Sequence, residues 1–336
     1  MGVLCSRIRL EEKLIFQALR ERRVEFERID VRQVIFDLNS TTPKDFDVVL
    51  IRCLSHSHAL YTAKILEEKG VRTVNSYEAI ATCGDKVLTT LALIEHGVPT
   101  PRTAIAFARE PALAAVEEMG YPIVLKPPVG SWGRLMGKLN DREAAEAVIE
   151  HKEALDKSQD VPFYIQDYIH KPGRDIRTLV VGDETVYAVY RRSSHWITNT
   201  ARGGNTSNLP VTPEIDHLSR AAAEAVGGSI VAVDILEDSD GSLLVNEVNH
   251  TPEFHGAMQA TDADIAGRIV DYVLKIASEG ATYFQRYCWL TCDRKGRLWY
   301  LQSRWRDNLC WIRNLTRYRA GLGRAFFSLS LPFQAG

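Results

Sequence analysis

Three oxygen-bearing side chains are spaced as if to bind a metal ion in the second half of the chain. Glu247 and Asn249 are two residues apart in a strand-like segment, so their side chains leave the same face. Asp234 lies in the apolar run 231–236, which we expect to be the neighbouring strand of one hairpin. Hard oxygen ligands on a covered face suit Mg²⁺ bridged to phosphates, whereas unpaired acids there would be costly. The alternative is the solvated face of a half-exposed sheet.

A lysine and a glycine-rich loop form a second candidate. Lys126 ends an apolar strand-like segment, and residues 127–138 follow with three glycines. Such a loop can approach a triphosphate closely and donate backbone N–H groups, while the lysine adds positive charge. No Ser or Thr follows Lys138, so this is not the phosphate loop of the G-x-x-x-x-G-K-[ST] form. Taken alone, the pattern is equally typical of an ordinary glycine turn.

Two further stretches are polar at places where a nucleotide or phosphate would need partners. The strand-like segment 163–168 breaks into a polar turn that contains Asp175, which offers backbone groups to a purine edge and a carboxylate to a ribose. From these residues alone, a strand and a surface turn is the favoured interpretation. The stretch 190–204 is cationic, and Arg192 and Arg202 are suited to neutralise phosphates. Its alternative is an ordinary surface loop.

In the first part of the chain the expected strands alternate with helices, and in the later part the expected strands pair with one another. Up to about residue 85, strands alternate with helices, which indicates a parallel sheet with crossover helices. The expected strands are 2–5, 24–29 and 47–51, and the expected helices are 11–22 and 58–69. Further on we expect helices at 86–96, 110–119, 141–151 and 215–226, and strands at 103–107, 121–126, 163–168, 178–181, 186–191, 231–237 and 243–248. The fold class is therefore α/β, with an α+β C-terminal part.

The composition is that of a globular protein, and we expect a cytoplasmic location. The chain has 336 residues, of which 45% are hydrophobic and 25% charged, and its formal net charge is −2. It has no apolar run of 18 residues and no signal-like N-terminus, so we expect neither a membrane segment nor export. The six dispersed cysteines are then expected to be free thiols in a reducing cytoplasm.

The last 55 residues differ in composition from the rest. From Thr282 on there are nine Arg and one Lys against two Asp, a net charge of +8, together with four of the six Trp. We expect a basic, aromatic-rich tail at 281–336 of uncertain order, with a hairpin at about 287–301, which is an appendage to the main domains. A nucleic-acid module is the alternative, since arginines and aromatic residues are interleaved there. Nucleic acid is nevertheless not the expected partner.

The order of these motifs resembles the ATP-grasp superfamily over residues 2–280, and within it the LysX-type ligases of lysine biosynthesis. The most specific stretches are 83–86, 130–134, 191–204 and 246–251. The resemblance implies an ATP-grasp fold behind an N-terminal parallel-sheet pre-ATP-grasp domain. The implied domains are the pre-ATP-grasp domain at 1–85, a central subdomain with a glycine-rich flap at 86–160, and a C-terminal subdomain with the metal site at 161–280.

The resemblance also implies roles for individual residues. The expected ATP-binding residues are Lys86, Lys126, Gly130, Ser131, Trp132, Gly133 and Arg134 at the phosphates, Gln166, Asp167 and Tyr168 along the adenine, and Asp175 at the ribose. Asp234, Glu247 and Asn249 are the expected ligands of two Mg²⁺ ions, for which Mn²⁺ is a substitute. Arg192, Asn199 and Arg202 are the expected catalytic residues. The expected substrate contacts are His195, Trp196, Gly203, Gly204, Glu253 and Phe254.

The implied reaction is an amide ligation through an acyl phosphate. The C-terminal glutamate of a small acidic amino-group carrier protein is phosphorylated by ATP, and the amino group of α-aminoadipate then displaces phosphate. Glutamate in place of α-aminoadipate stays open, because the two differ by one methylene. A ribosomal-protein glutamate ligase and a nucleotide-binding regulator without turnover are further alternatives. The resemblance also implies a homo-oligomer.

Overall fold

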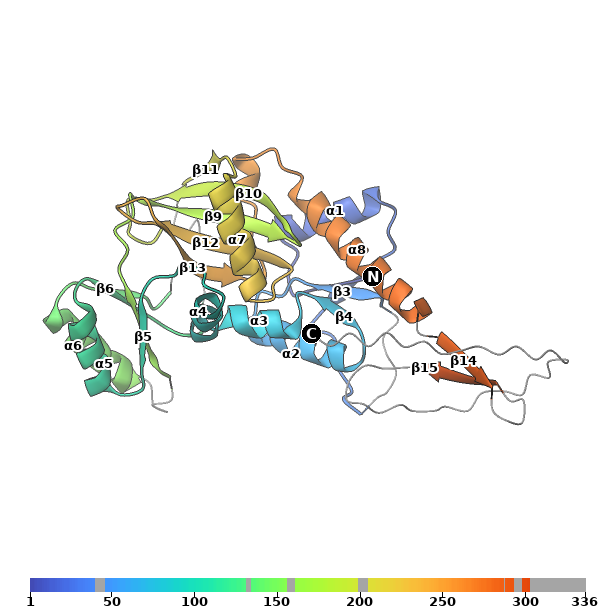
Figure 1. Ribbon diagram of the computed structural model, residues 1–336, viewed down its shortest axis with the longest axis horizontal. Helices are drawn as coiled ribbons and strands as arrows, with labels where there is room; N and C mark the ends of the chain where they lie inside the picture. The colour runs from blue at the N-terminus through green and yellow to red at the C-terminus, as the bar shows by residue number, and fades with distance from the viewer. Residues whose placement is uncertain are drawn as a thin grey trace. The chain divides into compact units, whose positions relative to one another are not determined.

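A computed structural model describes residues 1–39, 46–130, 134–155, 161–198, 205–286, 288–292 and 298–302 (Figure 1). The chain divides into two compact units, Met1–Ala277 and Ser278–Gly336. The three larger sheets lie in the first unit. Among the described helices, none combines the length and the apolar character that crossing a bilayer requires.

The N-terminal region is a parallel sheet with helices, as the alternation of strands and helices predicts. The strand order is β2-β1-β3-β4, and every neighbouring pair is parallel. Strands β1 and β3 are buried at every position, because helices and later elements cover both of their faces. The elements are β1 (Gly2–Cys5), α1 (Leu10–Glu21), β2 (Glu27–Asp30), β3 (Val48–Ile51), α2 (His56–Glu68), β4 (Arg72–Val74) and α3 (Tyr77–Gly84).

A second, smaller sheet follows, with the order β5-β8-β6-β7 and antiparallel pairing throughout. Helices α5 and α6 pack beside it and share its apolar core (Figure 1). The elements are α4 (Lys86–Glu95), β5 (Thr103–Ala106), α5 (Arg109–Met119), β6 (Ile123–Lys126), β7 (Gly137–Leu139), α6 (Arg142–Leu155) and β8 (Phe163–Asp167).

The third sheet is antiparallel with the order β11-β10-β9-β12-β13, and helix α7 lies along one of its faces (Figure 1). Successive side chains of each strand point to opposite faces of the sheet, and apolar residues such as Ile176, Val180 and Val231 pack toward α7. The elements are β9 (Arg174–Val181), β10 (Glu184–Arg192), β11 (Asn205–Leu209), α7 (Pro213–Ala225), β12 (Ile230–Glu237), β13 (Leu243–Asn249), the 3-10 turn η2 (Ala257–Gln259) and α8 (Ile265–Arg286).

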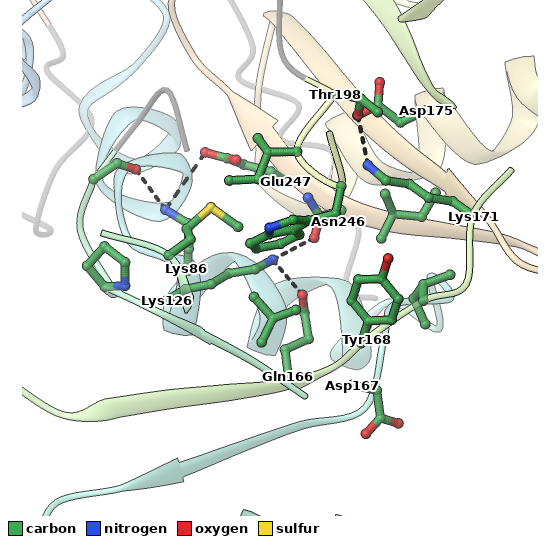
Figure 2. Close-up of a pocket in the computed structure, with 18 of the residues that line it drawn as sticks. Lys86, Lys126, Gln166, Asp167, Tyr168, Lys171, Asp175, Thr198, Asn246 and Glu247 are labelled. Carbon is green, nitrogen blue, oxygen red and sulfur yellow. Dashed lines mark hydrogen bonds and ion pairs between the residues drawn. The ribbon is translucent and has the colours of Figure 1, made fainter. Parts of the chain in front are cut away.

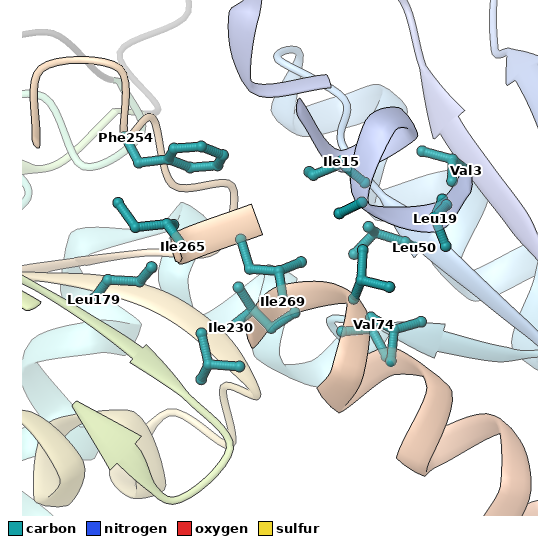
Figure 3. Packing of buried hydrophobic residues seen from close by; sticks show 14 of the residues in the cluster. Val3, Ile15, Leu19, Leu50, Val74, Leu179, Ile230, Phe254, Ile265 and Ile269 are labelled. Carbon is teal, nitrogen blue, oxygen red and sulfur yellow. The ribbon is translucent and has the colours of Figure 1, made fainter. Parts of the chain in front are cut away.

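The other face of the third sheet shares a core with the N-terminal region. Ile15 and Leu19 of α1 belong to the same buried cluster as Leu179 and Ile230 of the sheet and Ile269 of α8 (Figure 3). Burial of apolar surface is the main stabilising term in folding, so this cluster joins the N-terminal region and the third sheet into one folded body.

The second unit contains a described antiparallel hairpin of β14 (Cys288–Cys292) and β15 (Leu298–Gln302). This confirms the hairpin expected at 287–301. Helix α8 was not among the expected elements, and it continues past the composition change near residue 280.

Candidate active site

The register of β12 and β13 places the three predicted metal ligands on one face. Asp234 is directly opposite Glu247, and Asn249 is opposite Ala232, two residues further along. Residues that face each other across an antiparallel pair project to the same side, as do residues two apart on one strand. A register shift follows Asp234, so the alternation restarts beyond the site. The face carries two carboxylates and an amide.

Asp234 is buried and held by two arginines of neighbouring strands. Arg177 of β9 donates from Nε and Nη2 to its two carboxylate oxygens at 2.7 and 2.9 Å, and Nη2 of Arg191 lies 3.2 Å from Oδ2. Burial alone would raise the pKa of Asp234, but the charges of Arg177 and Arg191 outweigh it and lower the pKa. The carboxylate therefore stays ionised in spite of its burial.

Glu247 is the more open carboxylate of the pair. Its side chain is 24% exposed, and Nζ of Lys86 lies 3.9 Å from its Oε1. Among the described residues no three His, Cys, Asp or Glu side chains converge as a complete metal cage. Two carboxylates and an amide fit Mg²⁺, which keeps waters and binds substrate phosphates for its remaining ligands.

Lys86 and Lys126 line one cavity, as predicted (Figure 2). Lys86 opens helix α4, where the Asp85 side chain accepts hydrogen bonds from the first-turn N–H groups, and its Nζ donates to the carbonyl of Gly130 at 2.7 Å. Lys126 ends β6 and is 4% exposed. Its Nζ donates to Gln166 Oε1 at 2.5 Å and Asn246 Oδ1 at 2.7 Å. Burial lowers the pKa of Lys126 to about 7.

The cavity has a polar end at the lysines and an apolar slot beside them. The empty space in it is about 740 Å³, the solvent at its open mouth included. Its apolar lining comes from two strands, with Val124 in β6 and Leu236 in β12, and from three loop residues, Met136, Ile169 and Ile197. A phosphate chain at the lysines and a flat aromatic base in the slot match this division.

Gln166, Asp167 and Tyr168 all line the cavity, but they face different ways. The Gln166 carbonyl oxygen is engaged by Lys126. The Asp167 carboxylate points away from the other labelled residues (Figure 2), and burial raises its pKa. The Tyr168 ring lies under Nζ of Lys138 at 3.7 Å. The three side chains therefore do not form one continuous row for a purine edge, and the backbone N–H of Asp167 donates to the carbonyl of Arg102 at 2.9 Å.

Asp175, predicted at the ribose, is committed to other side chains. Arg191 donates from Nε and Nη2 to its two oxygens at 2.7 and 2.9 Å, and the Thr198 hydroxyl also donates to it. Lys171 donates from Nζ to Thr198 Oγ1 at 2.8 Å and lies 3.8 Å from Asp175. The carboxylate holds Arg191 against Asp234, which is a different arrangement from a free ribose acceptor.

Residues of the cationic stretch are separated by the pleat of β10. Arg191 projects toward Asp234 and is 2% exposed, whereas Arg192 is exposed and stacks over Tyr190 at 5.4 Å. The arginine next to the metal-ligand face is thus Arg191 and not Arg192, because neighbouring strand residues point to opposite faces.

Trp196 lines the cavity of Lys86 and Lys126, which we call the nucleotide cavity. Its ring centroid lies 6.3 Å from that of Tyr168, while His195 is exposed. The role of both residues as substrate contacts stays a prediction. The predicted residues Ser131, Trp132, Gly133, Asn199, Arg202, Gly203 and Gly204 lie outside the described residues.

A second cavity lies on the same sheet face, beyond Asp234 from the nucleotide cavity. Arg177, Tyr187 and Arg191 line it from the sheet, and Glu253 and His255 from the segment after β13. The Tyr187 hydroxyl is buried without a hydrogen-bond partner among the described residues, and burial raises its pKa to about 12. The predicted contact Glu253 lines this cavity, whereas Phe254 is buried in the shared core.

Several cationic or polar residues of these cavities were given no role from the sequence, among them Lys171, Arg177, Tyr187 and Arg191. Arg177 and Arg191 had a detectable signal. Each is a charged residue close to an apolar run of its strand, 179–181 in β9 and 186–189 in β10, where a buried charge is retained only with a partner. Tyr187 had none, since an aromatic residue in a strand is ordinary.

The arrangement can therefore bind a nucleotide triphosphate beside a metal ion and bring its terminal phosphate next to a second, cation-lined cavity. A family model described as the LysX pre-ATP-grasp domain matches residues 1–82, and one described as the RimK-like ATP-grasp domain matches residues 83–273. Both agree with the resemblance drawn from the motifs.

Named relatives and solved structures point the same way. The chain is 40% identical over 268 residues to the glutamate–LysW ligase ArgX of Sulfurisphaera tokodaii, covering 79% of this chain and 95% of the relative. It is 35% identical over 235 residues to the α-aminoadipate–LysW ligase LysX of Saccharolobus solfataricus, covering 69% and 85%. The structure of a RimK domain ATP-grasp protein from Sphaerobacter thermophilus aligns with a TM-score of 0.68 at 25% identity, covering 81% of this chain and 98% of that one.

A D-alanine–D-alanine ligase from Bacillus anthracis shares the fold, with a TM-score of 0.61 at 17% identity over 84% of this chain and 98% of that one. The ATP-grasp ligase family uses ATP with a divalent metal ion, and the two carboxylates, the amide and the lysines of this chain fit that use. The chain belongs to the RimK-like ATP-grasp ligases and carries a LysX-type pre-ATP-grasp domain.

Proposed function

We propose that this ligase joins an acidic amino acid, α-aminoadipate or glutamate, to the C-terminal glutamate of a small acidic carrier protein of the LysW kind. The observation that carries the proposal is the spatial order of three groups of residues at one face of the third sheet. The lysines and Glu247 lie at one end, Asp234 with its two arginines follows, and the second cavity lies beyond. The named relatives act on LysW with these two amino acids.

The reaction divides into two steps that these residues serve. A carboxylate oxygen of the carrier attacks the γ-phosphorus of ATP, ADP leaves, and an acyl phosphate forms. The amine nitrogen of the amino acid then attacks the acyl carbon, phosphate leaves, and the amine loses a proton. Phosphoryl transfer depends mainly on positioning and on charge neutralisation. Bound Mg²⁺, as one ion or as the two we expect, neutralises the phosphates, and Mn²⁺ is the expected substitute.

The protein side chains supply the rest of the positioning. Lys86 and Lys126 hold the phosphates, and Arg191, fixed by Asp175, faces the charge that develops between the two cavities. Arg177 and Arg191 both line the second cavity, and Nη1 of Arg177 is not used by Asp234. A guanidinium there suits a carboxylate of the amino acid. We keep the homo-oligomer and the cytoplasmic location as predictions.

Glutamate has one observation in its favour over α-aminoadipate. Relatives named for glutamate are 40% and 38% identical to this chain, whereas those named for α-aminoadipate are 35%, 30% and 33% identical. One methylene is worth only about 1–3 kcal/mol of discrimination, so activity with both is compatible with either assignment.

The test is an ADP-release assay with the full chain, a LysW-type carrier that ends in glutamate, Mg²⁺ and either amino acid. We expect carrier- and amino-acid-dependent ADP release, with a matching increase in carrier mass. Glu247→Gln should lower kcat about a hundredfold, since it removes a metal-binding charge. Asp240→Asn, at the exposed β12–β13 turn, is the matched control and should leave kcat unchanged. No release with any carrier and either amino acid would exclude this function.

A further inference from the structure

One wall of the second cavity is a segment without helix or strand. Residues 252–257 follow β13, and Glu253, His255, Gly256 and Ala257 face the cavity. Since only the last of them enters the 3-10 turn η2, no regular hydrogen-bond ladder sets the position of the segment. Its position depends on side chains that other elements direct at it.

Glu11 supplies the densest set of these contacts. It lies in the first turn of α1, in the N-terminal region, and is 2% exposed. Its Oε1 accepts hydrogen bonds from the backbone N–H groups of Phe254 and His255, each at 3.3 Å, and lies 2.9 Å from Nδ1 of His255. One buried oxygen thus collects three groups from two consecutive residues.

The charge of Glu11 is part of this contact. Burial would raise the pKa of its carboxyl, but the hydrogen bond with His255 and the other donors lower it by more, and the pKa is lowered. A buried carboxylate is retained only where its donors compensate for lost hydration. Hydrogen bonds to a charged group are also stronger than those to a neutral one.

Two arginines of the N-terminal region hold the two residues that precede Phe254. Arg9 pairs with Glu253 at 2.7 Å, and Arg52 donates to the carbonyl of Pro252 at 3.0 Å. Both arginines are fixed by Glu12, which is fully buried, at 2.8 and 3.1 Å. The N-terminal region therefore contacts four consecutive residues, 252–255, through side chains that are themselves held in place.

The other end of the segment is attached to the third sheet. The Thr206 hydroxyl of β11 donates to the carbonyl of Gly256 at 2.7 Å. Between the two attachments, Phe254 is buried in the core that also contains Ile15 and Ile265 (Figure 3). A shift of the N-terminal contacts would consequently change the shape of the second cavity and leave the nucleotide cavity as it is.

We infer that Glu11 is a positioning residue, which reaches from the pre-ATP-grasp domain to fix residues 254–255 and so sets the shape and selectivity of the amino-acid cavity. The N-terminal domain then takes part in choosing the amino acid, although the described residues that we propose for ATP lie outside it. The inference rests on the proposed function only for the identity of the ligand in that cavity.

The kinetic test compares Glu11→Gln and Glu11→Ala with Glu21→Gln. Glu21 ends the same helix and is exposed, so its variant is the matched control. We expect Glu11→Gln to raise KM for the amino acid about tenfold, Glu11→Ala to raise it further, and both to shift the ratio of kcat/KM for glutamate and α-aminoadipate. The KM for ATP should stay within about twofold in all three. An equal loss for ATP and amino acid would overturn the inference.

A second measurement does not need turnover. Amide hydrogen exchange of the full-length protein without substrates should be about tenfold faster at Phe254 and His255 in Glu11→Ala, and unchanged at Val233 in β12. Unchanged exchange at 254–255 would overturn the inference even if KM rises. If the wild type transfers no amino acid to a carrier, the proposed function fails, and the exchange result still decides whether Glu11 holds the wall.

Discussion

At the scale of single residues, the site is built from buried charges that hold one another. Asp175, Arg177, Arg191 and Asp234 form a chain of ion pairs across three adjacent strands. Removing one member of a buried pair leaves its partner desolvated, which costs far more than the pair itself contributes. Such a chain therefore keeps Arg191 at one position before any phosphate arrives, and catalysis gains from charges that need no rearrangement.

Asp175→Asn separates the two roles considered for this residue. Since the carboxylate holds the buried Arg191, the variant should be destabilised by about 3 kcal/mol, and kcat should fall while KM for ATP stays nearly unchanged. Urea unfolding and steady-state kinetics measure both. A raised KM for ATP with unchanged stability would instead support the ribose contact expected from the sequence.

The lowered pKa of Lys126 predicts that nucleotide binding depends on pH. In the free protein, burial lowers its pKa to about 7, whereas neighbouring phosphates favour the ammonium form and raise the pKa in the complex. Binding should then take up a proton above pH 7, and the affinity for ADP without metal should fall, by up to about tenfold per unit, between pH 7.5 and 9. Titration calorimetry in two buffers measures the uptake.

Lys126→Arg is the control for that measurement, because arginine stays protonated throughout this range. Its affinity for ADP should be nearly constant between pH 7.5 and 9. A slope equal to that of the wild type would assign the titration to another group.

At the scale of elements, strand pairing decides which residues meet. The β12–β13 hairpin brings Asp234 to Glu247, and the antiparallel neighbour β9 brings Arg177 to Asp234. The second of these pairings joins residues 57 positions apart in the sequence, and no local sequence pattern predicts it. Helix α8 is a similar case, since its apolar residues acquire a partner only where the N-terminal region and the third sheet meet.

Ile269→Ala tests the contribution of α8. Ile269 is fully buried in the shared core, so the truncation should destabilise the protein by about 3 kcal/mol through lost burial and the cavity that remains. Arg268→Ala is the neighbouring control, because its 57%-exposed side chain makes only a surface ion pair with Glu184, and it should cost less than about 1 kcal/mol. Similar effects for the two variants would show that α8 is not part of the core.

At the scale of the whole molecule, the first unit contains both cavities and the shared core. The family match ends at residue 273, and the unit ends at Ala277. The pre-ATP-grasp domain contributes core residues and holds the 252–257 wall, so it acts as a structural part of the ligase.

A chain that ends after Arg286 should keep full ligase activity, because α8 is then intact and every described site residue is present. A chain that ends after Asp264 lacks α8 and should fail to fold, since it leaves the shared core uncovered. Carrier-dependent ADP release and circular dichroism measure both. Inactivity of the first chain, if it is folded, would give residues 287–336 a role in the reaction.

Much of the fold and the main chemistry were determined by the sequence alone. Apolar runs and helical spacing predicted the parallel N-terminal sheet, the β12–β13 hairpin and helix α7 to within a few residues, because these depend on short-range periodicity. The spacing of Glu247 and Asn249 predicted that both side chains leave one face, because strand geometry alone requires it. With Lys126 at a strand end, a phosphate and metal site was one of two open interpretations, and the resemblance to the ATP-grasp superfamily favoured it.

Only the tertiary structure decided which charged groups neutralise one another. The choice of Arg191 over Arg192 depends on which face of β10 is turned to Asp234, and the commitment of Asp175 to Arg191 depends on the pairing of β9 with β10. The contact of Glu11 with 254–255 joins residues 243 and 244 positions apart. A buried charge needs a partner of opposite charge, since burial without one is too costly. Which partner lies within reach depends on the packed fold, and the order of residues along the chain does not specify those distances.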